Sequence, residues 1–281
     1  MKKLMLAVVA ALVVALLVVA GCGKKSNAPT SAQGILEKSQ QASKEIKSLK
    51  ASGSADVLTP DSEVKESKVA FDMEGNIISE TEVQAKIVAT DEKGEKTEAY
   101  IMDGYAYSYN PDTGWVKQKV DSSQQLTSGF MTPSQLTDLS KYAENLKKLP
   151  DEGNNFVISY DVSSKFFEKT LEGTATGSSA PATEEEKAAQ DMVELAKQML
   201  AGLKMTVVMK IDKTTYYPSE TKVTMTLKDA PLLGDMSVDM KIAFTDYNQP
   251  VTVSLPPEAQ NAQEVPSGTA GGIPSIPGLG I

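Results

Sequence analysis

The stretch "AYIMDGYAYSYNPDTGWVKQ", Ala99–Gln118, holds five of the sixteen aromatic residues in the chain. Its Asp103-Gly104 pair is a strong signal for a two-residue β-hairpin turn. In that hairpin Met102 pairs with Tyr105 and Tyr100 with Tyr107, and paired residues share a face. The sequence therefore predicts one antiparallel face that carries Tyr100, Met102, Tyr105, Tyr107 and Tyr109.

The second turn of this stretch is Pro111-Asp112-Thr113-Gly114. A four-residue loop would pair Asn110 with Trp115, bring Val116 and Val120 to the tyrosine face and send Trp115 to the other face. A five-residue loop would instead place Lys117 and Lys119 among the tyrosines. We predict the four-residue loop, because it keeps lysines off the aromatic face.

Period-two alternation continues on both sides of the hairpin. Upstream, residues 51–58, 68–75 and 82–91 alternate, with Val69, Phe71 and Met73 on one face and Val83, Ala85 and Ile87 on one face. Downstream, alternation recurs at 154–162, 205–211, 223–227 and 236–244, and "PVTVSLPPEA" suggests a last short strand. These segments predict a large antiparallel sheet.

Four segments instead have helical spacing or helical caps. An amphipathic helix is predicted from Ile35 to about Lys50, with Thr30 and Gln33 as a capping box. A second is predicted over 132–149, with Thr132 as N-cap, Pro133 at the first helical position and an apolar stripe. A short helix over 164–171, a mobile loop over 172–182 and a long helix over 183–203 follow. The expected fold is α+β, a sheet whose apolar face is covered by helices. In the predicted helix over 132–149, the apolar stripe consists of Leu136, Leu139, Tyr142, Leu146 and Leu149.

The N-terminus predicts export and lipidation. Lys2 and Lys3 precede an uncharged apolar run, Leu4–Ala20, and then Gly21 and Cys22. The alternative is a transmembrane anchor, since 17 apolar residues nearly span a bilayer. Cys22 is the only cysteine, so it has no intramolecular disulfide partner, and lipidation explains it. We predict a signal peptide over 1–21, a covalent diacylglycerol on Cys22 (with an N-acyl chain as an option) and a flexible tether over 22–33.

Composition narrows the function. Removing residues 1–21 takes away Lys2 and Lys3, so 26 lysines face 37 acidic residues and the net charge is −11. The chain has no arginine and no histidine. This composition argues against nucleic-acid binding, against lying flat on an anionic membrane and against histidine-based catalysis or metal binding. No metal or other cofactor is expected.

A serine hydrolase has only weak support. Ser62 with Lys65 and Ser219 with Lys222 match S-x-x-K, but that motif needs its serine at the start of a helix. Both matches lie in strand-like sequence, and the accompanying S-D-N and K-T-G motifs are missing. We therefore predict that the protein is not an enzyme.

The order of these features resembles a known superfamily. Val19-Ala20-Gly21-Cys22, which resembles a bacterial lipobox, is followed by "IKSLKASGSADV", a meander, "YIMDGYAYSYNPDTGWVK", a "TPSQL" helix, methionine-rich strands and "FTDYNQPVTVSLPPEA". This order resembles the lipoprotein-carrier superfamily of LolA, LolB, RseB, LppX and LprG over 34–259. The resemblance implies a half-open barrel of about eleven strands with helices on its concave side and, in some members, acyl chains held between them. No arginine exists here to close the barrel as one does in LolA.

Methionines favour a cavity over a filled core. Ten methionines follow residue 21, and methionine suits surfaces that accept varied apolar ligands. We predict a cavity wall in which the five hairpin residues named above join residues of the later strands. These are Met205, Val207, Met209, Met225, Leu227, Met236, Val238, Met240 and Ile242.

The predicted protein is a membrane-anchored extracytoplasmic lipoprotein that binds or carries a lipid or other hydrophobic ligand. The alternative is an RseB-like regulatory or structural lipoprotein that binds another envelope protein. Its domain would span 34–259, and the Gly/Pro-rich residues 260–281 are predicted to be disordered. Its location would be the outer face of the cell membrane or the periplasmic side of an outer membrane.

Overall fold

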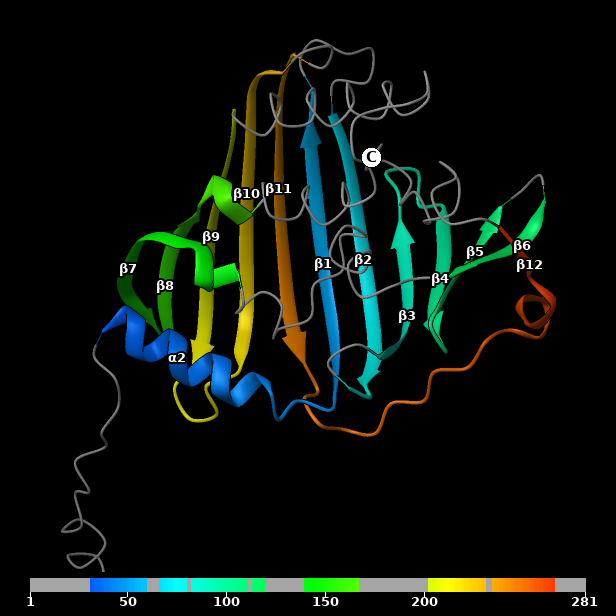
Figure 1. Cartoon of the computed structure of the whole chain (residues 1–281), viewed down its shortest axis with the longest axis horizontal. Coiled ribbons are helices and arrows are strands. Elements are labelled where there is room, and N and C mark those ends of the chain that lie inside the picture. The colour runs from blue at the N-terminus through cyan, green and yellow to red at the C-terminus, as the bar shows by residue number, and fades with distance from the viewer. Residues whose placement is uncertain are drawn as a thin grey trace, which may run out of the picture.

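The fold is an open sheet of twelve strands (Figure 1). The computed structural model describes residues 31–59, 66–79, 82–110, 113–119, 139–166, 202–230 and 234–265. The predicted signal peptide, Cys22, most of the predicted tether, the predicted loop over 172–182, the predicted long helix up to residue 201 and residues 266–281 lie outside this range, as do residues 132–138 and 167–171 of the other predicted helices. The strands, as the structure has them, are β1 (Ser48–Leu58), β2 (Glu66–Ile77), β3 (Val83–Thr90), β4 (Lys96–Met102), β5 (Tyr105–Asn110), β6 (Gly114–Lys119), β7 (Ala143–Glu152), β8 (Asn155–Val162), β9 (Leu203–Asp212), β10 (Pro218–Ala230), β11 (Gly234–Thr245) and β12 (Gln263–Glu264).

Two meanders form the sheet. Its order is β12-β6-β5-β4-β3-β2-β1-β11-β10-β9-β8-β7, so the meander β1–β6 joins the meander β7–β11 along the β1–β11 pair. All described pairs are antiparallel except β12 with β6. The predicted α+β class and large antiparallel sheet are confirmed, and the sheet stays open rather than closing on itself.

Helix α2 (Ala32–Ser43) is shorter than predicted. Its N-cap is Ser31, whose hydroxyl accepts a hydrogen bond from the Gly34 N–H at 3.1 Å, so Thr30 is not the cap. The helix ends at Ser43, and the apolar spacing that suggested a longer helix continues into β1 through Leu49. In Figure 1 α2 crosses one end of the sheet beside β7 and β8, and Ile35 and Leu36 join the main core there.

The predicted helix over 132–149 is wrong in its C-terminal part. Residues 139–142 form a 3-10 turn, η1 (Leu139–Tyr142), and β7 begins at Ala143. β7 is an edge strand with register shifts between Glu144 and Lys147 and between Leu149 and Glu152. The shifts leave every third residue half-buried, which imitates the spacing of a helix.

The C-terminal segment also differs from the prediction. Residues 251–256, expected as a strand, join no ladder and lead into a second 3-10 turn, η2 (Pro257–Asn261). β12 then pairs parallel with β6, so the described structure continues past Ala259, where the domain was predicted to end. Figure 1 shows this segment running from the end of β11 along the sheet to β6. We call residues 251–265 the C-terminal strap.

Candidate ligand-binding face

The ladder registers divide the sheet into an apolar face and a polar face. The apolar face is the one that carries Leu49, Ala51 and Ala55 of β1, and each antiparallel pair extends it to the next strand. At the ladder-paired positions of β1–β6 and β8–β11, none of the described side chains on this face is charged. On these ten strands the lysines and carboxylates of the paired positions lie on the polar face instead. At the β7 edge, by contrast, Lys148 pairs with Ile158 on the apolar side, and its amine lies 5.5 Å from the ring centre of Phe156.

The predicted methionine wall lies on the apolar face. Met205, Val207 and Met209 of β9 are buried in the main core with Ile35 of α2. Val238, Ile242 and Leu227 of β11 and β10 lie on the same face and are also buried. The registers thus bring together all nine predicted residues of the later strands.

Several long side chains of this wall are less buried than their ladder neighbours, such as Val223 and Val238. Met225 of β10 and Met236 and Met240 of β11 are half-buried, as are Phe71 and Met73 of β2. We call Met225, Met236 and Met240 the methionine patch. A 12-residue helix such as α2 is about 18 Å long, whereas ten strands are roughly 43 Å across, so among the described elements α2 covers only part of the wall.

The tyrosines lie on the other face, which corrects their predicted place in the cavity. The hairpin at Asp103-Gly104 forms as predicted, with Tyr100 opposite Tyr107. Tyr100 also pairs with Lys86, on the polar face, whereas Ala99 and Ile101 lie on the apolar face. Tyr100, Met102, Tyr105, Tyr107 and Tyr109 therefore share a face with one another but not with the methionine wall.

The second turn adopts the register that we considered less favourable. Tyr109 pairs with Trp115 and Asn110 with Gly114, whose φ of 79° is in the left-handed region. Trp115, Lys117 and Lys119 therefore join the tyrosines, and Val116 lies on the apolar face. The lysines are tolerated because their amines stay near solvent; that of Lys117 lies 5.1 Å from the ring centre of Tyr105.

The C-terminal strap covers the tyrosine face. Tyr100 and Tyr107 are buried with Ala259 and Ala262, and Val253, Leu255 and Trp115 pack against them. The ring centroids of Tyr100 and Trp115 are 5.9 Å apart. This aromatic cluster is therefore a small second core, separate from the methionine wall.

At the border of the aromatic cluster, the Glu98 carboxylate contacts both the Tyr100 hydroxyl and the Lys86 amine. The Tyr100 hydroxyl donates to Glu98 at 2.8 Å, and the Lys86 amine lies 3.0 Å from the other Glu98 oxygen. The hydrogen bond from Tyr100, together with Lys86, lowers the pKa of Glu98, while burial and the neighbouring carboxylate raise the pKa of Tyr100.

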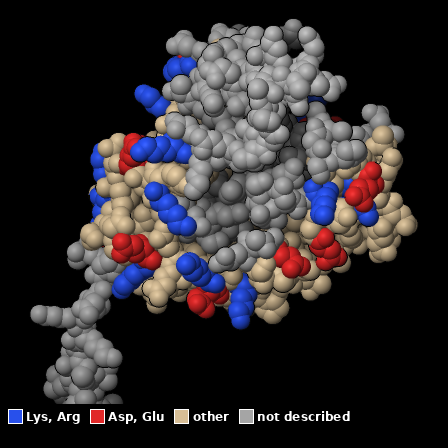
Figure 2. Space-filling model, viewed as in Figure 1, with Lys and Arg blue, Asp and Glu red and all other residues tan. Residues whose placement is uncertain are grey.

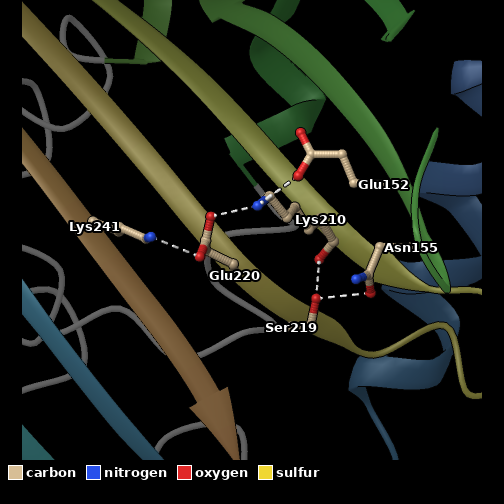
Figure 3. A network of polar contacts seen from close by, with 6 residues as sticks. All are labelled: Glu152, Asn155, Lys210, Ser219, Glu220 and Lys241. Carbon is tan, nitrogen blue, oxygen red and sulfur yellow. Dashed lines mark hydrogen bonds and ion pairs between the residues drawn. The ribbon is translucent and has the colours of Figure 1, made fainter. Parts of the chain in front are cut away.

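A charge network joins residues of β7 to β11 (Figure 3). Lys210 lies 2.8 Å from Glu152 and 3.0 Å from Glu220, and Glu220 lies 3.0 Å from Lys241. Ser219, one of the two S-x-x-K serines, donates to Asn155 at 2.9 Å and lies within strand β10, not at a helix start. The other match, Ser62 with Lys65, lies outside the described residues.

One pocket of about 430 Å³ lies on the polar face across β11, β1, β2 and β3. Its lining combines opposite charges, and Lys50 lies 3.8 Å from Glu74. Figure 2 likewise shows charges of both signs interspersed around the margin of the molecule. Such a lining does not suit an apolar ligand.

Within the described ranges, no group of three His, Cys, Asp or Glu residues could hold a metal ion.

A family model described as "Family of unknown function (DUF6612)" matches residues 31–264. The chain belongs to this family. Among curated proteins, none matches this DUF6612 chain in sequence.

The DUF6612 chain is similar to several solved structures. The lipoprotein LppX of Mycobacterium tuberculosis shares 14% identity at a TM-score of 0.46, over 79% of this chain and 98% of LppX. A LolA superfamily protein of Nitrosomonas europaea shares 11% identity at a TM-score of 0.30, over 81% of this chain and 96% of that one. A putative outer membrane lipoprotein-sorting protein domain of Vibrio parahaemolyticus shares 12% identity at a TM-score of 0.30, over 80% of this chain and 95% of that one. LppX and LolA are among the names of the superfamily that the order of the sequence features resembles.

Two buried polar groups on the apolar face were missed by the sequence reasoning. Gln118 of β6 and Thr221 of β10 are buried, and among the described residues the Gln118 Oε1 and Thr221 Oγ1 atoms have no hydrogen-bond partner. Gln118 lies on the opposite face from Lys117 and Lys119 in either register of the turn, but only the register with the lysines on the tyrosine face brings Gln118 to the apolar face. No described helix is long and apolar enough to cross a membrane.

Proposed function

We propose that this protein is a lipid-anchored extracytoplasmic lipoprotein that binds or carries a lipid or other hydrophobic ligand against the apolar face of its sheet. The observation that carries the proposal is the methionine patch. Met225, Met236 and Met240 lie half-buried on a face that bears no charge at its paired positions on ten described strands. Flexible thioether side chains at the centre of such a wall suit acyl chains of varied shape.

Membrane attachment through Cys22 is a separate part of the proposal. An acyl group on Cys22 would hold the protein at the membrane, and the sequence between Cys22 and α2 would separate the sheet from the bilayer. Palmitate labelling of cells that express the wild type and Cys22→Ala tests this part. We expect label and membrane retention in the wild type only; a labelled or fully membrane-bound variant would contradict it.

Native mass spectrometry of the full-length protein purified from membranes tests ligand binding. We expect a non-covalent lipid adduct, and we expect Met240→Lys to abolish it by placing a charge on the apolar face. Ser54→Lys is the matched control, because Ser54 is exposed on the polar face of the neighbouring strand and adjoins Ala55, the partner of Met240. Wild-type protein that never carries lipid but crosslinks to an envelope protein would favour the regulatory alternative.

A further inference from the structure

Gln118 is a polar side chain in an apolar wall. It pairs with Ala106 across β5 and β6, and this register places it on the apolar face. It is only 4% exposed, and its Oε1 finds no hydrogen-bond donor among the described residues. A buried acceptor that is left unpaired costs free energy, so it requires an explanation such as a ligand.

Small residues lead across the sheet to Gln118. One ladder row runs from Gly75 through Ala85, Ile101 and Ala106 to Gln118. The next row contains Ala99 and Ser108. Gly75, Ala85 and Ala106 are small, whereas Ile101 in the first row and Ile87 and Val116 in the second are larger apolar residues. The surroundings of Gln118 on this face are therefore uncharged and, apart from Ser108, apolar at the described paired positions.

The lack of charged side chains at the paired positions described on this part of the face limits which ligand groups can be buried next to the Gln118 amide. On the described apolar face of β1–β6, the paired positions offer no lysine to neutralise an anion, since Lys117 and Lys119 lie on the polar face. Burying an unpaired carboxylate or phosphate there would be far more costly than burying a neutral hydroxyl. An O–H group also matches an amide, because it donates to Oε1 and its oxygen can accept from the amide N–H groups.

We propose that Gln118 is a specificity-determining residue that binds a neutral hydroxyl of the ligand, and that the ligand class is therefore an acylglycerol rather than a free fatty acid or an anionic phospholipid. This inference rests on the proposed function. The acyl chain lies along the apolar face, and the glycerol hydroxyl hydrogen-bonds the Gln118 amide.

The test compares 1-monopalmitoylglycerol with its dimethyl ether, which keeps the acyl chain but has no O–H donor. Dissociation constants are measured by native mass spectrometry on the full-length wild type, on Gln118→Met and on Gln84→Met. Gln84 is the matched control, since it is a half-buried glutamine on the polar face of β3. We expect the wild type and the control to bind the glycerol about five-fold more tightly than the ether, the factor that one net hydrogen bond supplies.

In Gln118→Met the ratio should fall to about one, with binding of the ether unchanged, because only the hydrogen bond is lost. A ratio that stays at five in Gln118→Met overturns the role of Gln118 while leaving lipid binding intact. Should Gln118→Met not fold, the wild type alone decides: equal affinity for the glycerol, the ether and ionised palmitate overturns the inference. Failure of the wild type to bind any of the three would instead refute the proposed function itself.

Discussion

Tyr109 and Trp115 lie directly opposite one another on β5 and β6, with ring centroids 5.9 Å apart and planes at 65°. This pair belongs to the register that β5 and β6 share along their whole length. A shift of one residue would exchange the two faces of β6, moving Trp115 to the apolar face and Gln118 to the polar face. The short turn that ends at Gly114 therefore decides both the aromatic cluster and the buried amide.

Ala259→Asp should release the C-terminal strap. Ala259 is fully buried against Tyr100 and Tyr107, and an aspartate there would be buried without a partner. We expect a loss of about 1–3 kcal/mol in the free energy of unfolding, with a red shift in the emission of Trp115, the only tryptophan. Urea unfolding and fluorescence measure both, and Gln260→Asp, at an exposed position, should change neither.

Gly53→Ala should destabilise the centre of the sheet. A Cβ at Gly53 would lie 2.6 Å from Cζ of Phe71 and even nearer to the carbonyl oxygen of Lys241. Because that oxygen belongs to the backbone, relief requires β1 and β11 to separate, and we expect a loss of about 2 kcal/mol or more. Urea denaturation provides the measurement. Wild-type stability in Gly53→Ala would contradict the close packing of Phe71, and Ser54→Ala serves as the control.

Tyr100→Phe should change the acid sensitivity of the fold. The folded pKa of Glu98 lies below its ordinary value of 4.5, so its contribution to stability is complete above 4.5 and is lost as the pH falls through the folded pKa. Removing the Tyr100 hydroxyl takes away the largest cause of this lowering. We expect the Glu98 pKa to rise toward 4.5 in an NMR titration and the acid-induced loss of stability to become smaller. An unchanged pKa would show that the lysines near Glu98, Lys86 and Lys96, set it without the Tyr100 hydroxyl.

Lys210→Met should weaken the charge network of Figure 3 modestly. Lys210 contacts two carboxylates, but Glu220 keeps Lys241 as a partner, so we expect a loss of about 1 kcal/mol. The difference from wild type should shrink in 1 M salt, where the screening length falls to about 3 Å. Lys204→Met, an exposed lysine on the same strand, should have little effect at either ionic strength. A loss that does not depend on salt would indicate lost packing instead.

Most of the sheet was predictable because alternation and turn chemistry agree. Asp103 and Gly104 both have positive φ, as their residue types favour, and the Tyr100–Tyr107 pair followed from that turn. β7 was not predictable, since its register shifts convert a period of two into a period of three, and Leu146 and Leu149 then look helical. Residues 251–256 alternate like a strand, yet Val253 and Leu255 pack on aromatic rings without joining a ladder.

The sequence predicted which strands carry the candidate site residues, but not which face of the sheet each of those residues occupies. Met225 and Met240 could be placed on one wall because β10 and β11 alternate without interruption between them. The tyrosines could not be placed on that wall or off it from the hairpin alone, since local pairing fixes which side chains share a face but not which face meets the core. That choice depends on the pairing of β4 with β3, where Tyr100 meets Lys86. The face on which Gln118 lies depends on the turn between β5 and β6, and the sequence allowed more than one length for that turn.

The strap and α2 meet opposite margins of the sheet, α2 beside β7 and β8 and the strap on β6 (Figure 1). Traction applied between these two points would act across the strands rather than along them. Under such a load the hydrogen bonds between one pair of strands would break before those of the next pair. A load along the strands would instead be shared by all the hydrogen bonds of a pair at once. The molecule should therefore have low mechanical resistance when it is held at one margin and pulled at the other.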